Sequence, residues 1–550
     1  MNISVSQKRL QLAGYLLLAI PTIAFLLLTL KFWIGAVCSI GLLTALYFAF
    51  RGYNNDAVFS IPLKNLALVA VIVMTWCLLC GQGGYFAQKT DHHWRNAIMR
   101  DMVNYDWPVT YEDGSGLVYY IGYWTVPAII GKCGLYFGAD AAWSIANAAL
   151  LLWSTLNISV VTLLILAAFN RSDIISCLFV CGILVFFSGM DVVGYALYGL
   201  ATGRLCFPWN IEWWLNWSDS ITLAFTSNTH QLGWVFNQAI PAWVGAILYY
   251  RERRVETAAY IGMLLLPYSP FPLLGLFFIA VIDGVCNIFI RCKKGEVLSG
   301  LLSPFSIPNL VSIIVILPVF YLYYSSNLTV VNTIGSCEEL ARQTSSSIFT
   351  FVNIHNWTQF FHYIVFCLLE FGILGMLIFK ENRSERLFII SILALLFVGA
   401  TKIISMDYIL RSSIIPLFFL MLYTIKYFLE DNKTTWQNFF NKFTTKNFRF
   451  ILVSLCLLLG SATAVCEFMD SAYITQDCVR HGYKLPADRL GTLANSPQNS
   501  NQNFLIMDTS TSPFYNYIAR KPHNNIERIH EVNNKFDHSK PLDVYDYKHK

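Results

Sequence analysis

Charged residues are scarce in this chain. Of its 550 residues, 13% are charged and 56% are hydrophobic, and the mean hydropathy is +0.51. A soluble domain with so few charges could not cover its surface, so the composition excludes a soluble globular protein and predicts a membrane protein with many spans. The formal net charge of +5 is less informative, because the distribution of basic residues between the two sides of a membrane matters more than their sum.

Three further features are missing. The 14 cysteines show no spacing typical of a metal site. Cys466 and Cys478 are expected either to form a disulfide or to stay free thiols. No small-residue cleavage site follows the first apolar run, so no cleavable signal peptide is predicted. No internal repeat is visible, and in particular no pair of matching broken helices of the kind that inverted-repeat transporters contain.

What the chain has in abundance is long apolar runs. Runs of about 17 to 25 residues can form helices that cross a hydrocarbon core of about 30 Å. The prolines of "LLLPYSPFPLLG" leave the region 257–291 open between two short helices and one kinked hairpin. Thirteen spans are predicted, at 12–30, 33–50, 65–81, 142–169, 173–190, 236–250, 257–270, 272–291, 308–326, 357–380, 386–403, 408–428 and 449–466.

Basic segments predict the orientation of these spans. They fall on one face under this count, and that face is therefore predicted to be cytoplasmic. The N-terminus then lies in the cytoplasm and the C-terminus outside it. The cluster "RERR" is interpreted as a topology signal and nothing more. The basic segments are Lys8 with Arg9, "RERR" (251–254), "RCKK" (291–294), "KENRSER" (380–386) and 426–449.

The opposite, outer face receives the loops 82–141, 191–235 and 327–356 and the tail 467–550. The apolar, Tyr- and Trp-rich segment 117–138 could cross by length, but crossing would invert every later loop, so we expect it to lie in the outer interface. The chain therefore divides into a transmembrane domain, 1–466, and an outer C-terminal region. There "FLIMDT" predicts a strand and "SPFYNYIAR" a helix, which is typical of a small α/β domain or a cap packed on the outer loops.

Polar residues collect near the outer ends of the spans. A cavity lined by carboxylates and an arginine suits a substrate that is half lipid and half sugar phosphate. A carboxylate can take a proton from an attacking hydroxyl or orient a metal, and an arginine can hold a phosphate leaving group. The candidate residues are Asp91, His92, His93, Asp191, Glu212, His230, Asp407 and Arg411.

Most of these residues also have a purely structural interpretation. Asp91 is suited to cap the helix that follows it, and Asp407 and Arg411 are spaced to form an i,i+4 pair. These interpretations stay open beside the catalytic ones. Ordinary polar positions in an interface or a solvated loop are an equally open interpretation of His92, His93, Asp191 and Glu212.

Several blocks resemble a known family. The segment "WPVTYEDGSGLVYYIGYWTVPAIIGKCGLYFGADAAWSIANAALLL" is similar to the passage from the first outer loop into the next span in the C-type integral-membrane glycosyltransferase superfamily. "FSGMD", "FNQAIPAW" and "DYILRSSIIP" also resemble blocks of bacterial members of this kind. The resemblance implies an enzyme of the bacterial plasma membrane that moves a sugar from a polyprenyl-phosphate donor to a protein, lipid or polysaccharide at the outer face, with membrane lipids but no nucleic acid as partners.

The resemblance also implies roles for individual residues. Asp91 matches the first-loop acid that activates the acceptor, Asp191 a second carboxylate, and Arg411 the cation that grips the lipid phosphate. Asp91 and Asp191 would share Mg²⁺ or Mn²⁺ if a metal is needed. Substrate contacts are expected from the remaining candidates. Two departures are that the first large loop follows the third span rather than the first, and that "DHH" replaces a paired acid, which makes His92 and His93 further metal or phosphate contacts.

One residue favours another class of protein. Glu370 lies in the middle of the apolar run "FHYIVFCLLEFGILGMLIF", and His362 precedes it by eight residues on a similar helical face. An ionisable residue at that depth indicates a functional site. The alternative function is therefore a proton-coupled transporter or a flippase for lipid-linked glycans that uses Glu370. A membrane scaffold without activity, a third possibility, would need no acids at the junctions of loops and spans.

Overall fold

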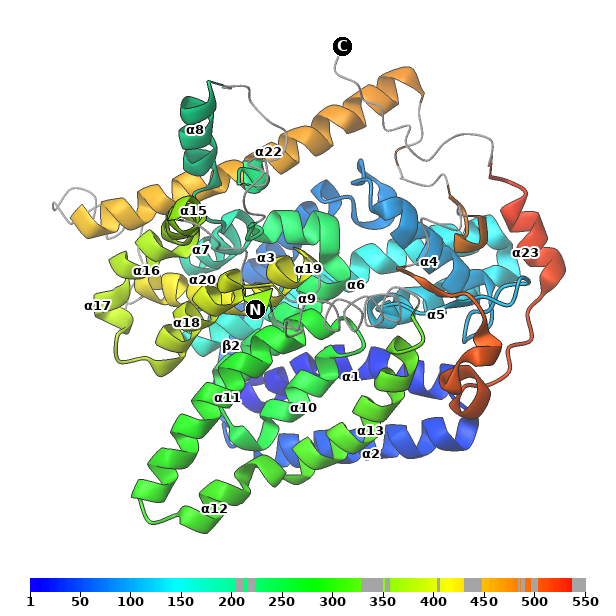
Figure 1. Cartoon of the computed structure of the whole chain (residues 1–550), viewed down its shortest axis with the longest axis horizontal. Helices are drawn as coiled ribbons and strands as arrows, with labels where there is room; N and C mark the ends of the chain where they lie inside the picture. The colour runs from blue at the N-terminus through cyan, green and yellow to red at the C-terminus, as the bar shows by residue number, and fades with distance from the viewer. Residues whose placement is uncertain are drawn as a thin grey trace.

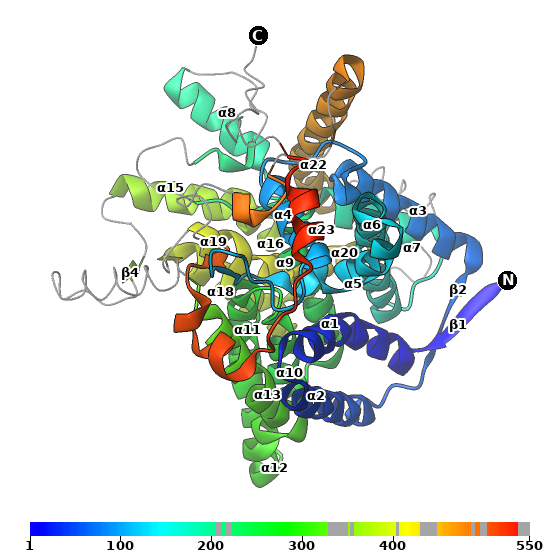
Figure 2. The same cartoon turned by 90° about the vertical axis from the view of Figure 1, so that its right-hand side faces the viewer.

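The computed structural model describes residues 1–203, 211–215, 223–327, 350–351, 357–402, 406–429, 448–482, 485, 490–495 and 503–536. The described part is a bundle of helices packed in several directions (Figures 1 and 2). The helices are α1 (Gln7–Thr29), α2 (Phe32–Gly52), α3 (Leu63–Leu79), α4 (His92–Asn104), α5 (Thr125–Cys133), α6 (Ala139–Ala168), α7 (Ile174–Phe186), α8 (Asp191–Thr202), α9 (Asn228–Glu252), α10 (Val255–Leu265), α11 (Pro270–Lys293), α12 (Val297–Leu302), α13 (Ile307–Tyr324), α15 (Trp357–Cys367), α16 (Ile373–Leu377), α17 (Phe379–Asn382), α18 (Arg386–Ala400), α19 (Met406–Ser412), α20 (Ile414–Leu429), α22 (Phe448–His481) and α23 (Ile526–Asn533).

Nine helical segments in the described residues are long and apolar enough to cross a membrane. Each of the thirteen predicted spans coincides with a helix, but four of these helices, α3, α9, α10 and α18, are outside the nine. Three of the four are short, whereas α9 has 25 residues and is interrupted by buried polar side chains. The nine are Gln7–Thr29, Phe32–Gly52, Ala139–Ala168, Ile174–Ala201, Pro270–Lys293, Val297–Tyr324, Trp357–Leu377, Tyr408–Leu429 and Phe448–His481.

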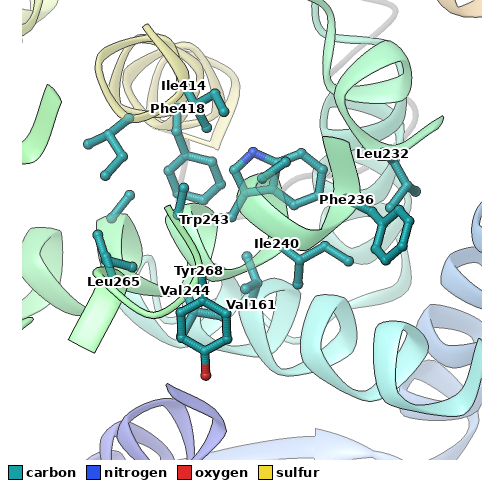
Figure 3. Packing of buried hydrophobic residues seen from close by; sticks show 14 of the residues in the cluster. Val161, Leu232, Phe236, Ile240, Trp243, Val244, Leu265, Tyr268, Ile414 and Phe418 are labelled. Atoms are coloured by element: carbon teal, nitrogen blue, oxygen red, sulfur yellow. The ribbon is translucent and has the colours of Figure 1, made fainter. Parts of the chain in front are cut away.

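The core of the bundle is built around α9. The side chains from Ala239 to Leu248 are buried on all sides of this helix. Figure 3 shows Trp243 of α9 beside Phe418 of α20, with Ile240 of α9 and Val161 of α6 below them. A central helix that meets only protein does not have to be uniformly apolar, which explains why α9 tolerates Asn and Gln where a lipid-facing helix would not.

One end of the bundle, called the basic end below, gathers the basic segments. Arg251 donates to the Gln7 side chain over 2.6 Å, and Arg253 and Arg386 both approach Asp283. Lys426 forms an ion pair with Glu385 over 2.8 Å. These contacts confirm that the basic segments described by the structure share one end of the bundle.

The opposite end, called the loop end, carries the first outer loop and the tail. Strand β6 (Leu505–Ile506) pairs antiparallel with β3 (Gly116–Leu117), and the Leu493 amide donates to Asp101 of α4 over 3.0 Å. Buried apolar residues of the tail, such as Phe514, belong to the same hydrophobic cluster as the helices. The tail therefore packs as a cap on the loop, the second of its two predicted forms.

Short strands close both ends of the chain's membrane domain. At the basic end β1 (Asn2–Ser6) pairs antiparallel with β2 (Val58–Pro62), which tethers the start of α1 to the start of α3. A third pair joins β4 (Thr350–Phe351) to β5 (Thr401–Lys402). The sheets are two-stranded, so the described fold stays essentially helical, as predicted.

Two details refine the sequence interpretation. Segment 117–138 forms consecutive short helical elements from Ile121 to Phe137, and the longest of them, α5, has nine residues. Helix α22 continues well beyond the predicted span end at 466. Cys466 and Cys478 both lie on it, about 18 Å apart along its axis, so the suggested disulfide between them is wrong.

Candidate functional site

A buried group of ionisable side chains lies where several helices meet at the loop end. Its members come from the start of α8, a short turn before α9, the first turn of α9, the centre of the α15–α16 segment and the middle of α22. All five side chains are at most 8% exposed. We call them the acid cluster: Asp191, Glu212, His230, Glu370 and Glu467.

His230 lies between two carboxylates. Its Nδ1 is 2.8 Å from Glu467 Oε1 and 3.1 Å from Glu212 Oε2. Glu467 is bound on its other oxygen by Lys89, over 2.7 Å, and Lys89 also contacts Asp470. The Glu467 carboxylate favours the charged form of His230, so Lys89 and His230 together balance Glu467.

Asp191 and Glu370 form the other half. Asp191 Oδ2 accepts hydrogen bonds from Ser188 over 2.9 Å and from Thr463 over 3.0 Å, and the Asp191 and Glu370 carboxyl groups lie within hydrogen-bonding reach of each other. Among the described residues, no lysine or arginine forms an ion pair with either. Two adjacent carboxyls in a buried place cannot both ionise readily, so the pair is suited to hold and pass one proton.

Local backbone features bring these two acids together. Glu370 lies in a π-helical turn, Leu368–Gly372, a feature that often marks functional sites. The Met190 amide, one residue before Asp191, donates to the Leu369 carbonyl over 3.1 Å. Gly460 lets α22 approach closely, since a methyl group there would lie 2.7 Å from the Ser188 carbonyl oxygen. The close approach of α22 places Thr463 beside Asp191.

Glu212 has the surroundings of a group that keeps its proton. It is fully buried and accepts a hydrogen bond from the Ser227 amide over 2.7 Å. Burial raises the pKa of Glu212 to about 8, against the opposing effect of the nearby His230. A carboxyl group with this pKa can act as an acid near neutral pH.

The structure brings three of the predicted residues together: Asp191, Glu212 and His230 are all in the acid cluster. Glu370, expected only for a transporter, joins them. The interpretation of Asp191 as a solvated loop residue is wrong, because the side chain is buried.

The first-loop residues lie elsewhere. Asp91 pairs with Arg95 over 3.3 Å, its side chain is 48% exposed, and it makes no capping hydrogen bond. His92 is buried, and its Nε2 donates to the Gly233 carbonyl over 2.8 Å. Burial and the neighbouring Arg95 lower the pKa of His92 to about 3, so this ring is neutral. His93 is also buried, and the interpretation of both histidines as exposed interface residues is wrong.

Arg411 lies in α19 at the start of the predicted twelfth span. Its guanidinium group is 5.9 Å from the ring of Phe271 at the beginning of α11. The next residue, Ser412, donates to the Phe271 carbonyl over 3.0 Å, which holds α19 against α11. The side chain of Asp407 lies outside the described residues.

Three residues of the site were missed from sequence. Lys89 lies two residues before Asp91, Glu467 is the first residue after the predicted last span, and Asp470 follows Glu467 by three residues. Only their place in the sequence could have indicated them, because each is an ionisable residue within a turn or two of the end of a span. Pairing between residues nearly 400 positions apart leaves no local pattern.

No group of three or more His, Cys, Asp or Glu side chains in the described residues is arranged to hold a metal ion. The two predicted metal ligands have different surroundings. Asp91 is half exposed and paired with Arg95, whereas Asp191 is buried beside Glu370. The residues present therefore do not fit a shared metal, and the chemistry below uses side chains alone.

Two apolar grooves flank the acid cluster. One, of about 410 Å³, runs between α15–α16 and α18 and includes Leu368, Phe371 and Gly372 of the turn that carries Glu370. The other, of about 570 Å³, runs between α7 and α22 and reaches Phe187, the residue before Ser188, which binds Asp191. Apolar grooves beside buried carboxyls are the combination that a lipid with a polar head requires.

No family model, no curated protein and no solved structure matches this chain. The function therefore has to be inferred from the chemistry of the acid cluster and from the grooves beside it.

Proposed function

We propose that this chain is a membrane glycosyltransferase that moves a sugar from a polyprenyl-phosphate donor to an acceptor at the outer face of a bacterial plasma membrane. The observation that carries the proposal is the Asp191–Glu370 pair, a buried carboxyl couple without a cation partner among the described residues, set between two apolar grooves. The acceptor is a protein, a lipid or a polysaccharide.

The proposed chemistry needs one base and one proton donor. Asp191 takes the proton of the acceptor hydroxyl while the hydroxyl oxygen forms a bond to the anomeric carbon. The bond from that carbon to the phosphate oxygen breaks, and its electron pair leaves with the phosphate. Glu212, which keeps a proton near neutral pH, donates a hydrogen bond to the departing phosphate oxygen. Arg411 remains the proposed contact of the lipid phosphate.

The grooves give the donor its place. An isoprenoid chain is apolar and flexible, so it can enter a lipid-facing groove without leaving the membrane. The α7–α22 groove is the better fit, because it is the larger of the two and its lining reaches Phe187, the residue before Ser188, which binds Asp191. The phosphate and sugar then extend from the end of the groove toward the carboxyls.

The transporter alternative uses the same acids differently. Glu370 beside Asp191 would bind and release a proton during transport. A transporter also needs a polar route to the other side, and along α9 the ten residues from Ala239 to Leu248 are apolar and buried. An apolar stretch of α9 therefore separates Gln238 from the polar residues at the end of the helix. This separation favours chemistry at one face over passage across the membrane.

The proposal includes a topology. Thirteen spans place the basic end in the cytoplasm and the loop end outside, with the N-terminus cytoplasmic and the cap extracytoplasmic. The acid cluster then lies at the outer side, where the lipid-linked donor presents its sugar.

The test is a transfer assay with the full-length protein in nanodiscs and a panel of polyprenyl-phosphate sugars. Donor consumption and polyprenyl phosphate release are followed by mass spectrometry for wild type, Asp191→Asn, Glu370→Gln and the exposed control Asp140→Asn. We expect the first two variants to lose transfer and the control to keep it. Folded Asp191→Asn protein with normal transfer would overturn the proposal, whereas proton uptake into liposomes that is lost only in Glu370→Gln would favour the transporter.

A further inference from the structure

A polar cavity lies at the basic end, far along α9 from the acid cluster. Its volume is about 270 Å³. It is lined by the ends of several helices, which suits a site at the level of lipid headgroups. The lining residues are Gln7, Tyr53, Asn55, Ala167, Ala168, Tyr250, Arg251, Arg253, Glu385 and Tyr423.

Arg251 brings an unneutralised charge to this cavity. Its guanidinium donates to the Gln7 side chain over 2.6 Å and lies 3.4 Å from the Tyr53 hydroxyl, both neutral groups. Among the described residues, no carboxylate forms an ion pair with Arg251. Neutral partners thus hold the Arg251 side chain in place, and its positive charge can still bind an anion.

Arg253 is held in an unusual conformation beside it. The residue ends α9 with a φ of 47°, in the left-handed region that residues other than glycine rarely adopt. Its side chain is fixed by Asp283, with a distance of 2.8 Å between Nη2 and Oδ1. Arg253 also belongs to the cavity lining, and backbone strain of this type is usually kept where geometry matters for function.

The cavity also offers hydroxyl groups. Tyr250 and Tyr423 line it, and neither hydroxyl forms a hydrogen bond with a described residue. Tyr423 as a whole is 1% exposed. The one acid in the lining, Glu385, is already paired with Lys426 over 2.8 Å and lies 3.8 Å from Arg253. The lining therefore presents the Arg251 guanidinium and two hydroxyls without hydrogen bonds to described residues, whereas Arg253 and Glu385 already have partners of opposite charge.

We propose that this cavity binds a phosphate group, supplied by an anionic lipid headgroup of the inner leaflet. Arginines and hydroxyl donors recognise phosphate oxygens directly, and basic pockets between transmembrane helices at the cytoplasmic side are suited to lipid headgroups. The same donors could take a free phosphate, so the two sources have to be separated by experiment. The site is independent of the acid cluster, and its occupation would brace the ends of α1, α6, α9 and α20.

The test uses the full-length protein in a neutral detergent, with dioctanoyl phosphatidic acid as probe and dioctanoyl phosphatidylcholine as reference, and counts bound lipid by native mass spectrometry. We expect one tight equivalent of phosphatidic acid, an affinity at least tenfold lower for Arg251→Gln, and no change beyond twofold for Arg51→Gln. Arg51 is the matched control, since it is an exposed arginine in the last turn of α2 at the same end. Equal losses in the two variants, or equal binding of the two lipids, would overturn the proposal.

A second variant keeps the test decisive if Arg251→Gln does not fold, because Arg251 also ties α9 to Gln7. Tyr250→Phe with Tyr423→Phe removes only hydroxyls without internal partners, and we expect a loss of affinity of roughly three- to tenfold. Inorganic phosphate at millimolar concentration identifies the source. Stabilisation of wild type but not of Arg251→Gln by phosphate would show that the headgroup phosphate suffices, and displacement of the lipid only by a second lipid would show that the acyl chains are required.

Discussion

The two ends of the bundle balance their buried charges in opposite ways. At the basic end Asp283, fully buried, is met by Arg253 over 2.8 Å, by Arg386 over 3.6 Å and by the Tyr249 hydroxyl over 3.2 Å. At the loop end Asp191, equally buried, has two hydroxyl partners and another carboxyl, Glu370. The two aspartates have the same burial and opposite electrostatic environments.

This difference separates acids that stabilise the fold from acids that can transfer a proton. A buried acid surrounded by cations stays ionised, and removal of its charge leaves those cations unpaired. A buried acid beside a second carboxyl can lose its charge with little cost to the fold, because a neutral side chain of the same shape keeps the hydrogen bonds. The first arrangement stabilises the bundle and the second permits proton transfer, so mutations at the two ends should affect different quantities.

The largest effect is expected for Asp191→Asn. The asparagine keeps the shape and the bonds to Ser188 and Thr463 but cannot accept a proton, so we expect transfer to fall by about 10²- to 10⁴-fold. The melting temperature should stay the same or rise, because one of two adjacent carboxyls is gone. Sugar transfer and tryptophan-fluorescence melting in detergent measure both. A variant that unfolds while its residual folded fraction still transfers sugar would place Asp191 with the structural acids.

Asp283→Asn should show the reverse pattern. Arg253 and Arg386 would lose their shared buried partner, and we expect a loss of stability of about 3–5 kcal/mol, visible as a clear drop in melting temperature. The transfer rate of the remaining folded protein should be near that of wild type. Glu296→Gln, an exposed acid at the same end, is the control and should melt normally. Normal melting of Asp283→Asn would mean that these ion pairs contribute nothing to the fold.

A pH dependence sharpens the comparison at Glu212. Burial raises its pKa from 4.5 to about 8, so the folded chain holds a proton that the unfolded chain releases. Its stabilising contribution is fully present below pH 4.5 and is lost as the pH rises through about 8. We therefore expect the wild-type melting temperature to fall more steeply than that of Glu212→Gln between pH 6 and pH 9. His230, Asp191 and Glu467 act on this carboxyl, so the difference between the two curves, rather than either curve, is the measurement; parallel curves would contradict a raised pKa.

The helices could be predicted from the sequence because a membrane imposes a local rule. Every backbone group in the hydrocarbon core has to be bonded within its own helix, so each span needs a long apolar run. Helix α9 marks the limit of this rule. It is buried in protein on all sides, tolerates Asn237 and Gln238, and is recognised less well by hydropathy than the lipid-facing α11.

The acid cluster could be predicted only in part. Asp191, Glu212 and His230 were found because they are ionisable and lie near span ends, and Glu370 because it interrupts an apolar run. Their assembly depends on how distant segments pack, as the Asp191–Glu370 contact shows, and packing of this type has no local signature. Arg251 shows the same limit. From the sequence "RERR" was interpreted as a topology signal only, and the place of Arg251 in a cavity wall depends on Gln7 and Tyr53, which lie about 200 positions away or more.

Asp91 gives the smallest expected effect and the sharpest check of the loop-end assignment. Sequence similarity implied that Asp91 is the acceptor-activating base, whereas the structure pairs its half-exposed side chain with the buried Arg95 at i,i+4. Water screens the half-exposed carboxylate, so the pair contributes little and Asp91→Asn should melt within a few degrees of wild type. Transfer should stay within about twofold, because Lys89 rather than Asp91 reaches the acid cluster from this loop. A loss of transfer comparable to that of Asp191→Asn, without a change in melting, would instead make Asp91 the base and require the first loop to move toward Asp191 when the donor binds.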